Sequence, residues 1–232
     1  MPLVARKLVP SSLRQQIAQE IRQAILNRSL VPGERLVERE LAARLGASLT
    51  VTREALIQLE MEGLIIKKPN ATTHVTQLSR EDVEQVFAVR RILERFAFQE
   101  AARKASAAHI HRLVELHEKA KEAAAAGNGC AYIGVDFQWH EAVWQAAGNQ
   151  CLLETLKRVS LPLFGFSAIR VATQEGFDLM HDTMTHAPLL KAIQARNPEA
   201  AVIAFDGFVT IWERQSLDAS DPAKITGAPS ST

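Results

Sequence analysis

Apolar residues in the first third of the chain recur at helical spacing and are separated by turn residues. A first amphipathic helix is predicted by apolar positions at that spacing: Leu13, Ile17, Ile21, Ala24 and Ile25. The Pro32-Gly33 pair predicts a turn after it, and a short helix is expected over about residues 37–45. A further helix is expected to begin at a Thr50 cap and to end at Gly63, and the stretch LIIKKPNATTHVTQL then predicts two short strands joined by a turn.

The order of these elements is helix, short helix, sharp turn, helix and two-stranded wing. It is typical of a winged helix-turn-helix, a fold in which the helix after the turn lies in the major groove of DNA. We assign residues 1–78 to this domain. The pattern by itself also allows a small helical subdomain that has no nucleic acid role.

Beyond residue 78 the pattern is helical throughout. Ser79 and Asp82 form a capping signature for a long helix that is expected to reach about Ser106. Further helices are expected over about residues 108–126, 131–147, 151–173, 179–195 and 198–215. Residues 79–216 therefore predict an all-α bundle, and the polar, proline-containing residues 217–232 predict a disordered tail. The fold class expected for the whole chain is mainly α.

The amino-acid composition agrees with a helical fold, and the distribution of apolar residues indicates the cellular location of the protein. Aromatic residues make up only 6% of the chain and alanine is abundant, which favours helix over sheet. No long apolar run predicts a membrane span, and the N-terminal residues lack the apolar core of a signal peptide, so we expect a cytoplasmic protein. Cys130 and Cys151 lie in apolar helical patterns, where we expect them to be buried without forming a disulfide.

Charge is distributed unevenly between the two parts. Residues 1–78 hold 11 Lys and Arg against 7 Asp and Glu, whereas residues 79–232 hold 16 against 19. A basic N-terminal part beside an acidic C-terminal part suggests a polyanionic partner for the N-terminal part.

Several motifs together resemble the GntR family of bacterial transcription regulators, in its FadR-like branch with an all-helical ligand-binding domain. The matching stretches are VPGERLVERELAARLGAS, TREALIQLEMEGLI and KKPNATTHVTQLS in the first part, and VRRILE, DFQWHEAVWQAAGNQCL, HAPLLKAI and NPEAA in the second. The resemblance covers about residues 12–214. It implies a homodimeric DNA-binding regulator, most often a repressor of a metabolic operon, that is controlled by a small carboxylate-type effector.

The predicted DNA contacts lie at the start of the helix after the turn, before the short helix and beside the wing. They are Arg35, Ser48, Leu49, Thr50, Thr52, Arg53, Lys67 and Lys68. Leu49 departs from the family pattern, which has an arginine there, and leucine cannot donate a hydrogen bond. Ala71 and Thr72 stand where the wing of the family often has Arg-Gly. We therefore expect an unusual operator sequence or a low affinity for DNA.

A candidate metal site begins with Asp136 and His140, which are four positions apart and share one helix face. This spacing alone is compatible with a simple hydrogen bond or with chelation of one ion. The resemblance implies chelation, with His186 as a further ligand and another histidine where this chain has Phe208. Either a three-ligand site for Zn²⁺, Ni²⁺ or Mn²⁺ survives, or metal binding is lost and the pocket is purely organic. His181 could be recruited only with distortion of its helix.

The resemblance also implies that Arg90 faces the pocket and pairs with an anionic effector, whereas its spacing also allows an ion pair with Glu94. His109, His111 and His117 are expected on an exposed face.

Two other functions remain alternatives. One is a metal-dependent hydrolase built on the Asp–His set, although no nucleophile elbow, phosphate loop or HExxH motif supports catalysis. The other is a ligand-sensing interaction module whose DNA binding has decayed.

Overall fold

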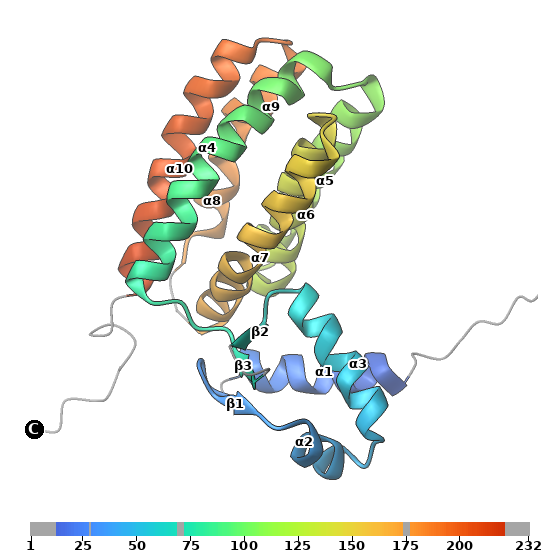
Figure 1. Ribbon diagram of the computed structural model, residues 1–232. Helices are drawn as coiled ribbons and strands as arrows, with labels where there is room; N and C mark the ends of the chain where they lie inside the picture. The colour runs from blue at the N-terminus through green and yellow to red at the C-terminus, as the bar shows by residue number, and fades with distance from the viewer. Residues whose placement is uncertain (1–12, 28, 69–71, 174–176, 221–232) are drawn as a thin grey trace, which may run out of the picture. The chain divides into compact units, whose positions relative to one another are not determined.

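The computed structural model describes residues 13–27, 29–68, 72–173 and 177–220. The chain divides into two compact units, Met1–Thr76 and Gln77–Thr232, close to the boundary expected after residue 78 (Figure 1). Helices dominate both units, so the predicted mainly α fold class is confirmed. Within the described residues, every helix is too short or too polar to cross a membrane.

The N-terminal unit is a winged helix-turn-helix, as predicted. Its elements are α1 (Leu13–Leu26), β1 (Arg35–Leu36), α2 (Glu38–Leu45), α3 (Leu49–Met61), β2 (Ile65–Lys68) and β3 (Thr72–Val75). The three strands form an antiparallel sheet in the order β1-β3-β2. The apolar face of α1, including Ile17, Ile21 and Ile25, is buried and packs with α3.

The turn before α3 depends on Gly46, whose φ of 62° lies in the left-handed region that favours glycine. The cap of α3 is Ser48, since its Oγ accepts a hydrogen bond from the Val51 amide at 3.3 Å. The predicted cap, Thr50, was wrong: Thr50 lies inside the first turn of the helix. A Ser48 cap shifts the start of α3 toward the glycine turn, so Leu49 becomes its first residue.

The C-terminal unit is entirely helical over its described residues (Figure 1). Its elements are α4 (Arg80–Lys104), α5 (Ala107–Ala125), α6 (Gly129–Ala146), α7 (Gln150–Thr173), α8 (Leu179–Met184), α9 (Ala187–Gln194) and α10 (Pro198–Ala219). The single helix expected over residues 179–195 is broken into α8 and α9 at Thr185 and His186. Pro188, in the first turn of α9, has no amide hydrogen for a continuous helix, which explains the break.

Two further expectations differ from the structure. The helix α10 continues to Ala219 and Ser216 is buried, so residues 217–219 are helical and not part of a tail; residues 221–232 lie outside the described part of the chain. Cys130 and Cys151 are exposed, contrary to the prediction. Each is the second residue of its helix, α6 or α7, where the chain has only just left a loop at the surface.

Aromatic rings fill the middle of the bundle. Phe98 stacks on Phe205 with ring centroids 5.1 Å apart, and Phe164 meets Trp212 at 5.0 Å. The helices α4, α7 and α10 contribute these rings, and α4 and α10 lie side by side (Figure 1). The polar residues described next are therefore enclosed in an apolar shell.

Candidate functional site

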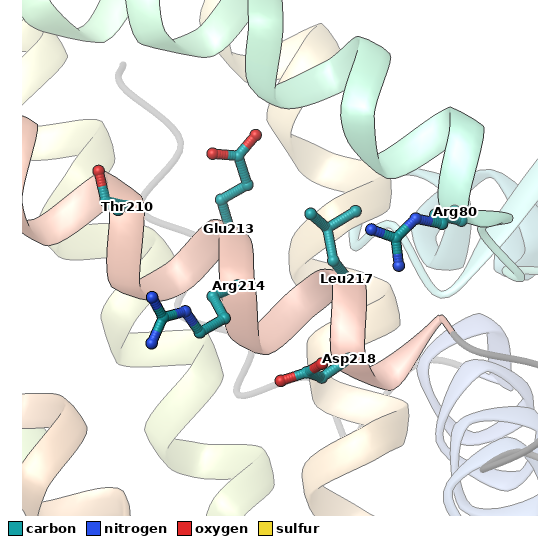
Figure 2. A pocket seen from close by; sticks show the side chains of 6 residues that line it. All are labelled: Arg80, Thr210, Glu213, Arg214, Leu217 and Asp218. Atoms are coloured by element: carbon teal, nitrogen blue, oxygen red, sulfur yellow. The ribbon is translucent and has the colours of Figure 1, made fainter.

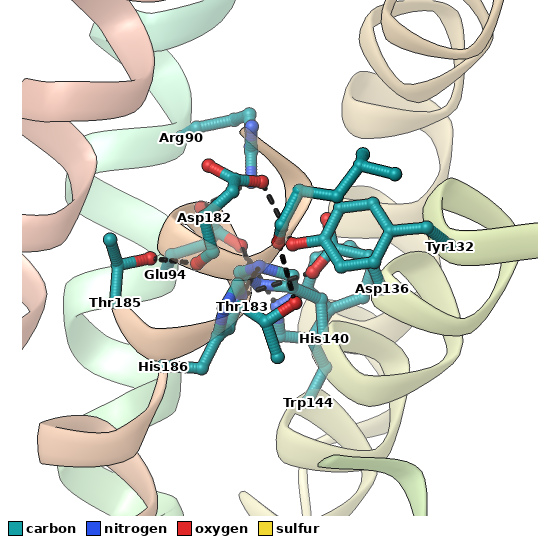
Figure 3. Close-up of polar contacts among 11 residues, drawn as sticks. Arg90, Glu94, Tyr132, Asp136, His140, Trp144, Asp182, Thr183, Thr185 and His186 are labelled. Atoms are coloured by element: carbon teal, nitrogen blue, oxygen red, sulfur yellow. Dashed lines mark hydrogen bonds and ion pairs between the residues drawn. The ribbon is translucent and has the colours of Figure 1, made fainter. Parts of the chain in front are cut away.

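The structure brings Asp136, His140 and His186 together inside the bundle (Figure 3). Asp136 and His140 come from one face of α6, and His186 lies at the break between α8 and α9. His186 Nε2 lies 3.0 Å from Asp136 Oδ1 and 3.3 Å from His140 Nε2. All three residues are buried, and one ligand atom from each lies within 4.8 Å of the others.

The spacing of these donor atoms fits a metal ion. Donors bound to one ion by bonds of about 2.0–2.2 Å stand about 3–3.5 Å apart, and the two distances from His186 Nε2 fall in that range. One carboxylate and two imidazoles form a ligand set that suits Zn²⁺, Ni²⁺ or Mn²⁺. The Asp–His group is therefore a candidate metal site with three protein ligands.

Phe208 lies where the resemblance implied another ligand. Its ring centroid is 4.8 Å from that of His186 and 5.5 Å from that of His140, so an apolar ring covers this side of the group. His181 is exposed on α8 and is not part of the group. Among the described residues, the donor set is limited to Asp136, His140 and His186.

Behind His140 lies a second buried set of polar groups, centred on Glu94. Glu94 Oε2 is 2.7 Å from Arg90 Nη2, and Glu94 Oε1 accepts a hydrogen bond from Trp144 Nε1 at 3.2 Å. His140 Nδ1 lies 3.2 Å from the same Oε1. Burial raises the pKa of Glu94, but the charge of Arg90 and the neighbouring His140 outweigh burial and lower it to about 2. Glu94 is therefore an anion in this site.

Arg90 forms the ion pair with Glu94 that its spacing allowed, and it also keeps donors that could bind an anionic effector. Its guanidinium pairs with Glu94 and lies 4.0 Å from the ring centroid of Trp212, and burial lowers its pKa although Glu94 opposes this. Its Nε and Nη1 have no hydrogen-bond partner among the described residues, although both are buried. Buried donors are rarely left unsatisfied, so these two nitrogens are available to an anionic ligand.

Two residues near the site were missed by sequence reasoning. Tyr132 donates its hydroxyl hydrogen to Asp182 Oδ2 at 2.8 Å (Figure 3). Burial and the charge of Asp136 raise the pKa of Asp182. Tyr132 precedes Asp136, and Asp182 precedes His186, by four positions. The same spacing that identified the Asp136 and His140 pair could have indicated both residues.

Metal binding is expected to release a proton from His186 at a pH below the raised pKa of this residue. Burial lowers the pKa of His186, but the charge and hydrogen bond of Asp136 outweigh burial and raise it above its usual value. An ion needs the lone pair that this proton occupies, so affinity should increase as the pH rises to the raised pKa and level off above it. Calorimetry of Zn²⁺ binding in buffers with different ionisation enthalpies measures the protons released. If binding releases no proton at a pH below the usual pKa of histidine, this expectation is contradicted.

An open pocket of about 270 Å³ lies elsewhere in this unit, between the start of α4 and the end of α10 (Figure 2). Its lining residues are Arg80, Thr210, Glu213, Arg214, Leu217 and Asp218. Two arginines and two carboxylates balance one another there. The buried Asp–His group is the stronger candidate, because its donors converge on a single point.

In the N-terminal unit, most predicted DNA-contacting residues lie at the surface. The exposed ones are Arg35 on β1, Ser48 and Thr50 at the start of α3, Arg53 on α3, and Lys67 and Lys68 on β2. Leu49 is half-buried. Ala71 lies outside the described residues, and Thr72 is half-buried on β3. Arg39 and Arg44, both exposed on α2, are basic residues that the sequence analysis did not select.

Thr52 was wrongly predicted to contact DNA. Its side chain is fully buried, and its hydroxyl donates to the Ser48 carbonyl oxygen at 3.0 Å. Thr52 is the fourth residue of α3 and lies on the buried face of this helix, so it is not available to a DNA groove. Thr52 therefore secures the first turn of α3.

Arg53 is held at the surface by an acidic neighbour. Its Nη2 and Nε lie 2.8 and 3.0 Å from Glu38 Oε2, and the hydrogen bond and charge of Glu38 raise the pKa of Arg53. The Arg53 side chain is still 58% exposed, so a phosphate or a guanine edge can reach it. Glu38 orients the guanidinium and would compete with a phosphate for it.

The chain matches two protein-family models and several known proteins. Residues 85–208 match the FCD domain, and residues 13–75 match the bacterial regulatory proteins of the gntR family. The chain is 28% identical over 211 residues to a probable D-xylose utilization operon transcriptional repressor of Paenarthrobacter nicotinovorans, covering 90% of this chain and 89% of that protein. It is 24% identical over 198 residues to the HTH-type transcriptional regulator McbR of Escherichia coli, covering 83% and 87%.

Solved structures share the fold. The structure of McbR/YncC from E. coli has a TM-score of 0.67 at 22% identity and covers 88% of this chain and 98% of its own. A putative GntR transcriptional regulator from Rhodococcus sp. RHA1 has a TM-score of 0.65 at 22% identity, with coverage of 90% and 99%.

Proposed function

This chain belongs to the gntR family of bacterial regulatory proteins and carries an FCD domain, and we propose that it represses an operon as a homodimer under the control of a small carboxylate metabolite. The observation that carries the DNA-binding part is the exposed N-terminal end of α3, with Arg53 beside it. The named relatives are transcription regulators rather than enzymes, so the hydrolase alternative has no support.

Operator binding follows from the chemistry at the start of α3. The first amides of a helix attract phosphate, and the side chains there can reach base edges in the major groove. Arg53 offers a donor pair for guanine or phosphate, while Lys67 and Lys68 extend the basic surface along β2. Leu49 offers only apolar contact, such as a thymine methyl, so base specificity depends more heavily on Arg53.

Effector binding is assigned to the buried polar group of the FCD domain. Asp136, His140 and His186 would hold a divalent ion, with Zn²⁺, Ni²⁺ and Mn²⁺ as candidates, and the ion would attract a carboxylate. The unsatisfied donors of Arg90 supply a second attraction for the same anion. Enclosure by aromatic rings excludes water and strengthens both interactions. A small carboxylate with few apolar atoms fits this chemistry.

Exposed apolar side chains support the homodimer. Ile92 and Phe96 on α4 and Ile203 on α10 are 73%, 45% and 73% exposed, on helices that lie side by side. We call this surface the α4/α10 face. Arg95 pairs with Asp206 across the two helices, so the charges at this face balance and do not repel an identical face. An apolar, charge-balanced surface fits a second copy of the chain around a two-fold axis.

Control of transcription requires that the effector bind one arrangement of the dimer more tightly than the other. An effector shifts such an equilibrium only by its difference in affinity for the two arrangements. The effector is expected to lower operator affinity, as in release of a repressor.

DNA binding is tested by a gel shift with the region upstream of the gene itself, at two salt concentrations. Arg53→Ala is expected to lower operator affinity about 5- to 150-fold if Arg53 contacts guanine. If Arg53 contacts phosphate, the slope of log affinity against log salt should fall by about 1. Arg112→Ala, which removes an exposed arginine of the other unit, is the matched control. If the protein binds DNA without salt dependence and without preference over random DNA, the regulator function is refuted. The ligand-sensing interaction module with decayed DNA binding is then the remaining alternative.

A further inference from the structure

We propose that Glu94 is a positioning residue of the metal site, which holds His140 in the tautomer that leaves its Nε2 lone pair for the ion. The proposal rests on the metal site of the proposed function. The carboxylate of Glu94 lies on the Nδ1 side of the His140 ring, whereas the candidate ion site lies on the Nε2 side. Glu94 therefore cannot bind the ion directly. Glu94 faces Nδ1 of His140, whereas Nε2 faces His186 (Figure 3).

The two nitrogens of His140 have different surroundings. Nδ1 lies 3.2 Å from Glu94 Oε1, and Nε2 lies 3.3 Å from His186 Nε2. The contact with Glu94 is not aligned as a hydrogen bond, so its influence is electrostatic. A lone pair on Nδ1 would face a negative oxygen, whereas an Nδ1–H is attracted to it. The neutral ring therefore carries its hydrogen on Nδ1, and Nε2 is left unprotonated on the side of Asp136 and His186.

Glu94 can impose this tautomer because its charge and position are both fixed. Arg90 lies 2.7 Å from Oε2 and keeps the carboxylate ionised, and an ionised carboxylate only accepts hydrogen bonds. Trp144 donates to Oε1 and holds that oxygen in place. Arg90 and Glu94 are one turn apart on α4, and His140 and Trp144 are one turn apart on α6, so two helical turns face each other.

Burial makes this arrangement effective. The side chains of Arg90, Glu94, His140 and Trp144 are all fully buried, so water cannot screen the charge or offer another partner. A carboxylate behind a histidine ligand raises the basicity of the ligand and fixes its orientation, which is typically worth about 10- to 100-fold in metal affinity. Glu94 contributes in this way although it does not touch the ion.

The first test compares the wild-type full-length chain with Glu94→Gln for binding of Zn²⁺ alone, by competition with a chelating dye. The amide can accept or donate at His140, so it no longer selects one tautomer. We expect affinity to fall about 10- to 100-fold. Glu100→Gln is the matched control, because Glu100 is on the same helix but pairs with Lys104. Equal Zn²⁺ affinity in the wild type and in Glu94→Gln overturns the proposal.

A second variant guards against simple unfolding. Glu94→Gln leaves the Arg90 charge buried without its partner, which can destabilise the fold. The double variant Arg90→Gln/Glu94→Gln removes both charges and keeps two amides of similar size. We expect it to show the helical circular dichroism of the wild type and the same loss of Zn²⁺ affinity as the single variant. Zn²⁺ binding as tight as that of the wild type by the folded double variant overturns the proposal.

The third measurement does not depend on metal. Nitrogen-15 NMR of the metal-free wild type should show the Nδ1–H tautomer of His140, and Glu94→Gln should shift the ring toward the Nε2–H tautomer. An Nε2–H tautomer in the wild type overturns the proposal even where Zn²⁺ binds. Failure of the wild type to bind Zn²⁺ refutes the metal site itself and the positioning role with it. Equal binding by wild type and variant refutes the positioning role alone.

Discussion

His140→Ala is expected to abolish stoichiometric binding of a divalent ion by the purified protein. His140 supplies one of three donors, and its loss leaves Asp136 and His186 as a two-donor set inside an apolar shell. Removal of a residue that lies behind a metal ligand typically lowers metal affinity about 10- to 100-fold. Removal of the ligand His140 itself should lower the affinity by more than this. Metal analysis of the purified proteins, followed by Zn²⁺ titration, measures it.

The control for this variant is His111→Ala, which removes an exposed histidine from α5 and should leave metal content unchanged. Equal metal in the wild type and in His140→Ala would remove His140 as a ligand. A wild type that binds no metal would favour the purely organic pocket that the sequence left open. Phe208, whose ring lies against both histidines, would then be part of an apolar wall for the effector.

The double variant Ile92→Glu/Ile203→Glu is expected to convert the proposed homodimer into a monomer. Two carboxylates from each copy would enter an apolar contact and repel their counterparts. Because a dimer holds two α3 helices on one operator, a monomer should bind about 10²- to 10⁴-fold more weakly. Sedimentation equilibrium measures the association, and a gel shift on the same samples measures the DNA affinity.

Met180→Glu is the matched control, since it places the same charge at a 40% exposed apolar position on α8, outside the α4/α10 face. Its mass in solution should equal that of the wild type. A double variant that remains dimeric with native helix content would exclude the α4/α10 face as the contact between copies. A wild type that is monomeric at all concentrations would refute the homodimer itself.

Local sequence patterns determined the elements of this protein and part of its candidate site. Helical periodicity specifies which residues share a face, because each turn takes 3.6 residues. It therefore placed Asp136 beside His140 and allowed Arg90 to pair with Glu94, and both pairs are present. The stretch LIIKKPNATTHVTQL, with its turn signal at Pro69-Asn70, likewise indicated the wing. The resemblance added His186 and Arg90 as site residues, because short motifs carry them.

Only the tertiary structure decided which helix faces meet. His117, expected to be exposed, is 5% exposed on α5, and Thr52 faces the core although it lies in the first turn of α3. Glu94 and His140 are 46 positions apart in the chain, and their contact exists because α4 packs against α6. Such contacts result from many apolar side chains packing together, and no local spacing encodes them. The sequence and its resemblance thus identified the candidate ligands, whereas Glu94, the residue proposed to orient one of them, became visible only when the helices were assembled.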